Sequence, residues 1–277
     1  MLLSREQRGC YARFGGVAQF ARVWRAALAA SGVRKGNRRR KKGRSPARFF
    51  VVFSQNHDQV GNRLCGERLA ALVPFEARKL AAATVLLSPF LPLLFKGEEY
   101  GERTPFHYFI SYSIPTLIQA VRNRRRAELV AFGWQGDPPD PQADAAFKRS
   151  KLSRALLKQP RHRLLREFYR ELIRLRRTLP ARTAIAGSTM NVRAHGPQEV
   201  LLVRYSSGAG RVLLGVNYSD RVAAVAPAVS PGRWRTLLDS ASHRWNGPGS
   251  LVPEELSSDG RVKLSLQPNS VLAFEER

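Results

Sequence analysis

The sequence lacks a long uninterrupted hydrophobic run. Its most apolar stretch, residues 86–95, contains Ser88, Pro89 and Pro92, so it is too short and too broken to cross a bilayer. The residues before Arg5 contain no apolar core of the kind that a secretory signal needs. We therefore expect a cytoplasmic protein with no membrane partner.

Cysteine is also scarce. Cys10 and Cys65 lie in different segments and have no metal-ligand spacing, which favours reduced, structural thiols over a disulfide or a metal site. No other cluster of ligand residues, such as HExxH, is present in the sequence. The sequence therefore predicts no metal site and no cofactor.

Acidic residues are few, since 21 Asp and Glu stand against 47 Lys and Arg, and the net charge is +26. Much of the excess lies in residues 34–44, a basic segment that also contains glycine. Such a run is typical of a solvated loop whose charges repel one another. Because no aromatic residue interleaves it to stack on bases, we expect no nucleic-acid partner, although basic side chains could bind phosphates.

The spacing of apolar residues divides the chain into a mixed α/β part and an all-β part. It predicts helices at residues 14–31, 64–87, 115–130 and 161–179, and strands at residues 49–53 and 91–95. After Pro180 it predicts only short strands, at residues 200–205, 212–216, 234–238, 262–266 and 271–274. We expect parallel βα units in residues 1–182 and a β-sandwich in residues 183–277.

Each predicted strand of the first part ends in a polar cluster. Residues 54–59 (SQNHDQ) follow the first strand, and residues 96–102 (KGEEYGE) follow the second. The carboxyl ends of parallel strands form the edge at which α/β enzymes hold their substrates. The first cluster could hydrogen-bond sugar hydroxyls, and its Asp58 could stabilise an oxocarbenium-like transition state. The structural alternative is a strand-end cap followed by a hydrogen-bonded turn.

The second cluster contains two adjacent carboxylates, Glu98 and Glu99. Neighbours on an extended chain point in opposite directions, so both cannot serve one bond without a turn. Burial of one of them by pairing with an arginine is at least as strong an interpretation as catalysis. Nearby aromatic residues could form a platform that stacks on sugars, or they could fill a core: Phe106, Tyr108, Phe109 and Trp134.

Several motifs resemble those of the α-amylase family of glycoside hydrolases. Residues 53–63 (FSQNHDQVGNR) look like its fourth conserved region, and residues 92–102 (PLLFKGEEYGE) are similar to its last barrel-strand motif. The resemblance is specific to the malto-oligosyltrehalose trehalohydrolases at residues 132–136 (FGWQG), 139–141 (PDP) and 168–176 (FYRELIRLR). Two positions depart from the family pattern. Lys96 stands where the family usually has Met, and Tyr112 stands where it has His.

The resemblance implies a (β/α)₈ barrel followed by a C-terminal β-sandwich. It also implies retaining hydrolysis of the α-1,4 bond that joins trehalose to a maltooligosaccharide, so the substrate would be maltooligosyl-trehalose or a related α-glucan. Asp58 would be the carboxylate that stabilises the transition state. The substrate-binding residues would be His57, Gln59, Asn62, Arg63, Glu99 and Tyr100.

The resemblance also implies that the catalytic site is incomplete. In the family, a nucleophilic Asp and an acid/base Glu stand on earlier barrel strands, whereas residues 1–48 contain one carboxylate, Glu6. A whole barrel needs about 250 residues. We therefore expect a C-terminal fragment with about the last quarter of a barrel, inactive by itself, which a complementary chain could complete.

Two alternatives remain open. The chain could be another α-amylase-family enzyme, such as a branching enzyme or a trehalose synthase, although residues 132–136 and 139–141 argue against this. It could instead be a non-catalytic remnant that binds glycans or nucleic acid.

Overall fold

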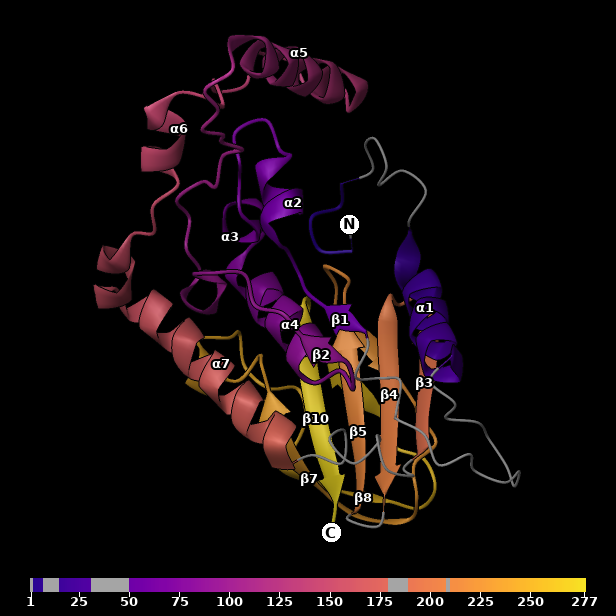
Figure 1. Ribbon diagram of the computed structural model, residues 1–277. Coiled ribbons are helices and arrows are strands. Elements are labelled where there is room, and N and C mark those ends of the chain that lie inside the picture. The colour runs from indigo at the N-terminus through magenta and orange to yellow at the C-terminus, as the bar shows by residue number, and fades with distance from the viewer. Residues whose placement is uncertain (1, 7–14, 31–49, 179–188, 208–209) are drawn as a thin grey trace.

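The computed structural model describes residues 2–6, 15–30, 50–178, 189–207 and 210–277 (Figure 1). The basic segment and Cys10 lie outside the described residues. The helices and helical turns are α1 (Gly16–Ala30), α2 (His57–Gly61), α3 (Leu69–Leu72), α4 (Phe75–Leu86), η3 (Glu98–Tyr100), α5 (Pro115–Ala131), α6 (Asp144–Arg149), η4 (Arg154–Lys158), α7 (Pro160–Thr178) and η7 (His243–Trp245). The strands are β1 (Val51–Val52), β2 (Leu91–Pro92), β3 (Thr189–His195), β4 (Val200–Ser207), β5 (Gly210–Asn217), β6 (Ala223–Val225), β7 (Gly232–Asp239), β8 (Glu255–Ser258), β9 (Leu264–Leu266) and β10 (Ser270–Glu276).

Helices α1, α5 and α7 form close to the positions that the apolar spacing predicts. The prediction of one helix over residues 64–87 is wrong, because the segment forms two helices, α3 and α4. Pro74 stands between them as the N-cap of α4. Proline has no N–H to donate to a preceding turn, so it suits the start of a helix and breaks its interior.

The two predicted strands of the first part are shorter than expected but pair as expected. Strands β1 and β2 are parallel, with Val51 opposite Leu91 and Val52 opposite Pro92. The Leu91 N–H donates to the Phe50 carbonyl at 2.9 Å, and the Leu93 N–H donates to the Val52 carbonyl at 2.8 Å. This parallel pair brings the two polar clusters to the same edge.

The second part forms an antiparallel six-stranded sheet in the order β3-β4-β5-β10-β7-β8, accompanied by the small pair β6-β9. Successive residues of β4 point to opposite faces. Leu201 and Val203 enter a core shared with α1, α4 and α7, whereas Val200 and Leu202 enter a second core shared with β6 and β9. Both faces of the sheet are therefore covered, one by helices and the other by strands.

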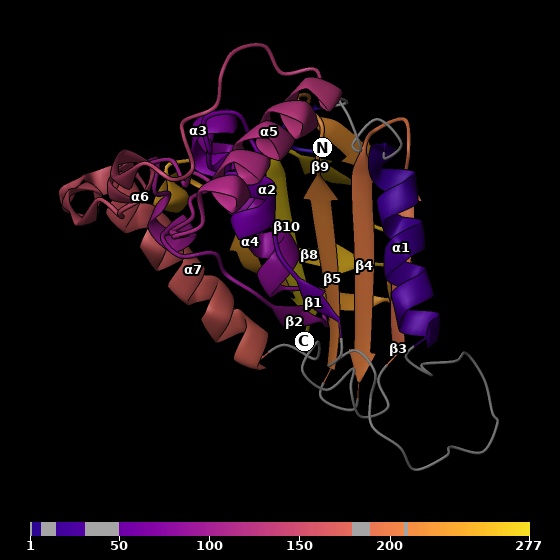
Figure 2. The ribbon, with the colours of Figure 1, turned by 45° about the horizontal axis from the view of Figure 1, so that its top comes forward.

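The helices surround the sheet unequally. Figures 1 and 2 show α1 lying along β3 and β4, while α4 and α7 lie toward β10. Helix α5 lies at the end of the molecule that carries α2, away from most of the sheet. The predicted boundary near residue 182 lies outside the described residues, so the division into two domains stays a prediction.

No helix within the described ranges is long and apolar enough to cross a membrane.

Candidate functional site

The turn that follows β1 begins with a capping box. Asn56 is the N-cap of α2, and its Oδ1 accepts from the Asp58 N–H at 2.7 Å and from the Gln59 N–H at 3.3 Å. Gln59 Oε1 in return accepts from the Asn56 N–H at 3.0 Å. This reciprocal pattern satisfies N–H groups that the first turn of a helix leaves free. Gln59, predicted to bind substrate, thus uses its side-chain oxygen within the turn.

The capping box leaves two side chains of the turn free to reach solvent. The side chain of His57 is 70% exposed and that of Asp58 is 64% exposed. They lie beside each other, with His57 Nε2 at 3.4 Å from Asp58 Oδ1. An exposed carboxylate next to an imidazole, at the carboxyl end of a parallel strand, can accept hydrogen bonds from sugar hydroxyls and can stabilise positive charge.

Asn62 and Arg63 lie at the other end of α2 and are held by neighbouring residues. Asn62 Oδ1 accepts from Arg125 at 3.1 Å. Arg63 is paired with Glu6 at 2.7 Å, and its Nε lies 3.5 Å from Glu67. The Arg63 guanidinium also lies 4.9 Å from the centre of the Trp134 ring. In this state, therefore, the Arg63 side chain is occupied by contacts within the chain.

The residues after β2 form the 3₁₀ turn η3, not the extended chain assumed from the sequence. Gly97 and Gly101 flank it with φ of 87° and 73°, a left-handed conformation in which glycine has no steric penalty. Within the turn Glu98 is buried and Glu99 is half-buried. The turn thereby separates the two adjacent carboxylates into different environments.

Glu98 is held by neutral groups, whereas pairing of one carboxylate with an arginine was one of the two interpretations that the sequence left open. Its Oε2 accepts from Ser54 Oγ at 3.3 Å and from Gln55 Nε2 at 3.3 Å. Burial raises the pKa of the Glu98 carboxyl to about 7, because desolvation disfavours its charged form. The carboxyl after β2 is thus joined directly to the residues that precede the Asp58 turn.

Tyr100, predicted to bind substrate, points inward. It is buried, and its hydroxyl donates to Glu102 Oε2 at 3.0 Å. Glu102 also accepts from the backbone N–H groups of Thr104 at 2.8 Å and Ser153 at 2.6 Å. Although burial opposes the effect, these donors lower the pKa of the Glu102 carboxyl. Tyr100 therefore anchors the loop after η3 and is not exposed at the surface.

Aromatic residues of the segment after β2 and of α6 form an edge-to-face series. The ring centroids are 5.3 Å apart for Phe95 and Phe106, 5.8 Å for Phe106 and Phe109, and 5.4 Å for Phe109 and Phe147. Tyr108, Phe109 and Phe147 are exposed. The series thus combines core packing at one end with an accessible aromatic surface at the other.

Arg125 is a buried charged side chain beside the turn, and no local pattern in the sequence predicts it. Arg125 Nη2 donates to the Gly61 carbonyl at 2.6 Å and to the Arg63 carbonyl at 3.0 Å. Gly61 is the last residue of α2, where a helix leaves C=O groups without partners, and Arg63 follows two residues later. Burial lowers the pKa of the Arg125 guanidinium. No group of three possible ligands that could hold a metal ion occurs among the described residues.

Several curated proteins with a similar sequence are malto-oligosyltrehalose trehalohydrolases. The chain is 41% identical over 179 residues to the malto-oligosyltrehalose trehalohydrolase of Saccharolobus solfataricus, which covers 63% of this chain. It is 43% identical over 183 residues to that of Arthrobacter ramosus, again covering 63% of this chain. It is 38% identical over 231 residues to that of Rhizobium sp., covering 79%. The chain resembles the malto-oligosyltrehalose trehalohydrolases. The predicted resemblance is thereby confirmed.

The matched region is only part of each malto-oligosyltrehalose trehalohydrolase. The chain covers 30% of the Saccharolobus protein, 32% of the Arthrobacter protein and 37% of the Rhizobium protein. It therefore spans about a third of the length of these curated relatives. No family model matches the sequence.

Solved structures confirm the fold class. A putative α-amylase from Salmonella typhimurium matches with a TM-score of 0.64 and 33% identity, covering 82% of this chain and 35% of that one. A trehalulose synthase matches with a TM-score of 0.58 and 16% identity, covering 99% of this chain and 50% of that one. The fold is the C-terminal part of an α-amylase-type barrel followed by a β-sandwich, as the sequence predicted.

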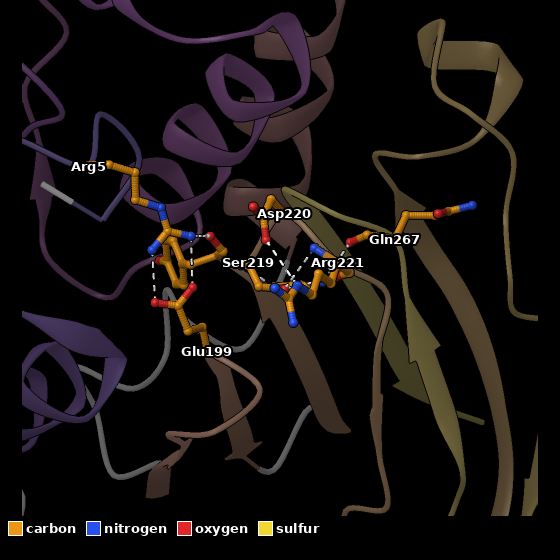
Figure 3. Close-up of polar contacts among 8 residues, drawn as sticks. Arg5, Glu199, Ser219, Asp220, Arg221 and Gln267 are labelled. Atoms are coloured by element: carbon orange, nitrogen blue, oxygen red, sulfur yellow. Dashed lines mark hydrogen bonds and ion pairs between the residues drawn. The ribbon is translucent and has the colours of Figure 1, made fainter.

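A cleft of about 610 Å³ lies beside the turn that carries Asp58. Its walls include Phe53 and Val60 from around the turn, together with residues 2–6. Figure 3 shows how this N-terminal segment is fixed: Arg5 makes two bonds to the Glu199 carboxylate, at 2.9 and 2.8 Å, and one to the Tyr218 carbonyl at 2.9 Å. In this structure the segment lines the cleft from the side of the six-stranded sheet.

Proposed function

We propose that the chain provides the C-terminal third of a retaining glycoside hydrolase that releases trehalose from maltooligosyl-trehalose. In this proposal Asp58 is the carboxylate that stabilises the oxocarbenium-like transition state, and His57 binds the same sugar ring. The observation that carries the proposal is the exposed pair His57 and Asp58 at the carboxyl end of β1, where barrel enzymes present their catalytic side chains. The similarity to malto-oligosyltrehalose trehalohydrolases supports the substrate.

The remaining catalytic groups would come from polypeptide outside the residues described here. A retaining glycosidase needs a nucleophile and an acid/base carboxyl about 5 Å apart, flanking the bond that breaks. Around the turn, Glu98 is buried and bonded to Ser54 and Gln55, and Glu6 is paired with Arg63. Neither carboxylate is free to attack a sugar, so Asp58 serves as an assisting group.

The parallel pair β1-β2 supports the same conclusion. Strands of a parallel sheet are normally covered on both faces and extended by further strands. Here the apolar side chains of the pair and of its flanking residues are exposed: Phe50, Val51, Phe53, Leu91, Leu93 and Leu94. We expect further parallel strands, from a complementary chain or segment, to pair with this edge and cover these side chains.

A chimeric enzyme tests the proposal. In it, this chain replaces the stretch of the Arthrobacter ramosus malto-oligosyltrehalose trehalohydrolase that it matches, and the rest of that enzyme is kept. We expect the chimera to release trehalose from maltooligosyl-trehalose, and the isolated 277-residue chain to release none. Release of trehalose by the isolated chain would show that its own residues complete the site. A folded chimera without activity would contradict the proposed function.

A further inference from the structure

Helix α2 is too short to hold its own position. It has five residues, and its capping box fixes the geometry within the turn but not the direction of the turn relative to the strands. The side chains of His57 and Asp58, at its beginning, are largely exposed and lie beside each other. The orientation of Asp58 therefore depends on what holds the two ends of α2.

The beginning of α2 is held by Glu98. Its carboxylate accepts from Ser54 Oγ and Gln55 Nε2, the two residues that precede the N-cap. Gln55 Oε1 also accepts from the Leu69 N–H at 2.9 Å, so one amide joins the carboxylate to the start of α3. Both Glu98 and Gln55 are buried. The segment between β1 and α2 is thereby fixed against the loop that follows β2.

The end of α2 is held by Arg125. Its guanidinium donates to the carbonyls of Gly61 and Arg63 and to the Asn62 side chain. Arg125 is also one of only two buried residues in the seventeen-residue helix α5, the other being Leu129. Burying a charge costs free energy unless close hydrogen bonds offset it. Helix α5 thus buries few side chains, and one of them is a guanidinium that lies against α2. The hydrogen bonds that this guanidinium makes best explain why it is buried there.

We propose that Glu98 and Arg125 are positioning residues for Asp58, which hold the two ends of α2 and so fix the direction in which His57 and Asp58 face. Neither residue touches the sugar. Each acts through hydrogen bonds to the segment that carries Asp58. The inference rests on the proposed function only for the role of Asp58, because the restraint on α2 is a property of the chain itself.

Amide hydrogen exchange of the ¹⁵N-labelled chain tests the proposal. The reporters are the N–H groups of Asp58 and Gln59, which bond to the N-cap, and that of Asn62, which donates to the Asp58 carbonyl at 2.9 Å. We expect Glu98→Ala and Arg125→Met each to raise their exchange at least about tenfold, the effect of losing one charge-assisted hydrogen bond. Amides of β5 should keep their protection, because β5 is paired on both sides within the six-stranded sheet.

Conservative variants separate positioning from a general loss of stability. Glu98→Gln keeps an acceptor oxygen at the same reach, so it should keep the protection of the three amides. Glu98→Asp keeps the charge but withdraws it by one methylene, so it should lose that protection. The matched controls are Glu99→Gln, on the same turn, and Arg124→Met, on the same helix and exposed. Both controls should exchange like the unaltered chain.

The result that would overturn the proposal is unchanged exchange at the three amides in Glu98→Asp and Arg125→Met. If Glu98→Ala fails to fold, Glu98→Asp replaces it, and if Arg125→Met fails to fold, Arg125→Lys replaces it. Each replacement keeps the charge but changes the hydrogen-bond geometry. The outcome is independent of the proposed function. An inactive chimera would contradict the role of Asp58 without affecting the proposed restraint on α2. Unchanged amide exchange would contradict the restraint without affecting the role of Asp58.

Discussion

At the scale of single residues, Glu98 shows how burial changes the chemistry of a carboxyl. Its adjacent neighbour, Glu99, is half-buried, while Glu98 is 6% exposed and has a pKa raised to about 7. Burial is the main cause, and the charge of Glu99 adds to it. The hydrogen bonds that it accepts from Gln55 and Ser54 oppose this rise in pKa. The environment of this carboxyl therefore combines opposing influences, and desolvation is the largest.

The raised pKa predicts a pH-dependent stability. Between pH 4.5 and 7 the folded state binds a proton at Glu98 more tightly than the unfolded state does, so this contribution to stability is lost as the pH rises. Glu98→Gln carries no such proton. From pH 5 to pH 8 we expect the free energy of unfolding of the unaltered chain to fall, relative to that of Glu98→Gln, by roughly 2 to 3 kcal/mol. Urea unfolding at both pH values measures the difference. The control is Glu128→Gln, because the Glu128 side chain is 43% exposed and pairs with Arg124. Parallel pH profiles for Glu98→Gln and the unaltered chain would contradict the expectation.

At the scale of elements, Lys79 joins α4 to the second part of the chain. It is buried, and its Nζ donates to the carbonyls of Ser240 at 2.6 Å and Trp245 at 2.8 Å, and pairs with Glu76 at 2.8 Å. One ammonium thus satisfies two carbonyls around η7 and one carboxylate on its own helix. Burial lowers the pKa of the Lys79 ammonium, and Glu76 opposes that change. This cation therefore adds a polar contact to the apolar core that α4 shares with the six-stranded sheet.

Removal of that cation should destabilise the whole chain. Lys79→Met keeps the length and most of the apolar volume of the side chain, but it leaves the Glu76 carboxylate and two carbonyls without a partner. We expect a loss of about 3 kcal/mol in the free energy of unfolding, because breaking a buried pair leaves an uncompensated charge. Chemical denaturation measures the change. The control Lys148→Met removes an exposed pair with Asp144 and should change stability by less than about 1 kcal/mol. Equal effects of the two substitutions would show that burial of Lys79 contributes nothing.

The elements also show what could be predicted from the sequence. Helix α7 was predictable because Leu165, Phe168 and Leu172 repeat at helical spacing, and prolines stand near both ends of the helix. Strands β4 and β5 were predictable from short apolar runs between turn residues. The break at Pro74 was missed because the apolar residues on both sides of it resemble one continuous helix.

The candidate site was predictable only in part. The turn around Asp58 carries a local signature, since Asn56 and Gln59 have the spacing of a capping box. Arg125 carries none, because it stands among other arginines of α5 and its partner Gly61 is 64 residues away. Tyr100 follows Glu99 in a polar cluster, yet a flanking left-handed glycine turns it into the protein. Contacts of this kind depend on the tertiary fold, which local patterns do not encode.

At the scale of the whole molecule, the helices and the six-stranded sheet share one core, whereas β1 and β2 are left at an open edge. Residues of α4, α7 and the sheet pack together in that core. By contrast, Val51 is 48% exposed and Leu91 is 52% exposed, although both lie on strands of a parallel pair. The chain spans about a third of its curated relatives. The molecule therefore has a stable core and an apolar edge that further strands could cover.

We propose that Asp58 acts as an assisting carboxylate in a trehalose-releasing site. The most direct measurement is kcat for trehalose release by the chimera with Asp58→Asn, compared with the chimera carrying Asp137→Asn. Asp137 is 84% exposed and pairs with Arg126 on the surface, so its loss should leave kcat unchanged. We predict that Asp58→Asn lowers kcat by at least about 10²-fold, the scale of losing one group that stabilises charge in a transition state. An Asp58→Asn chimera that retains the kcat of the Asp137→Asn control would contradict the account.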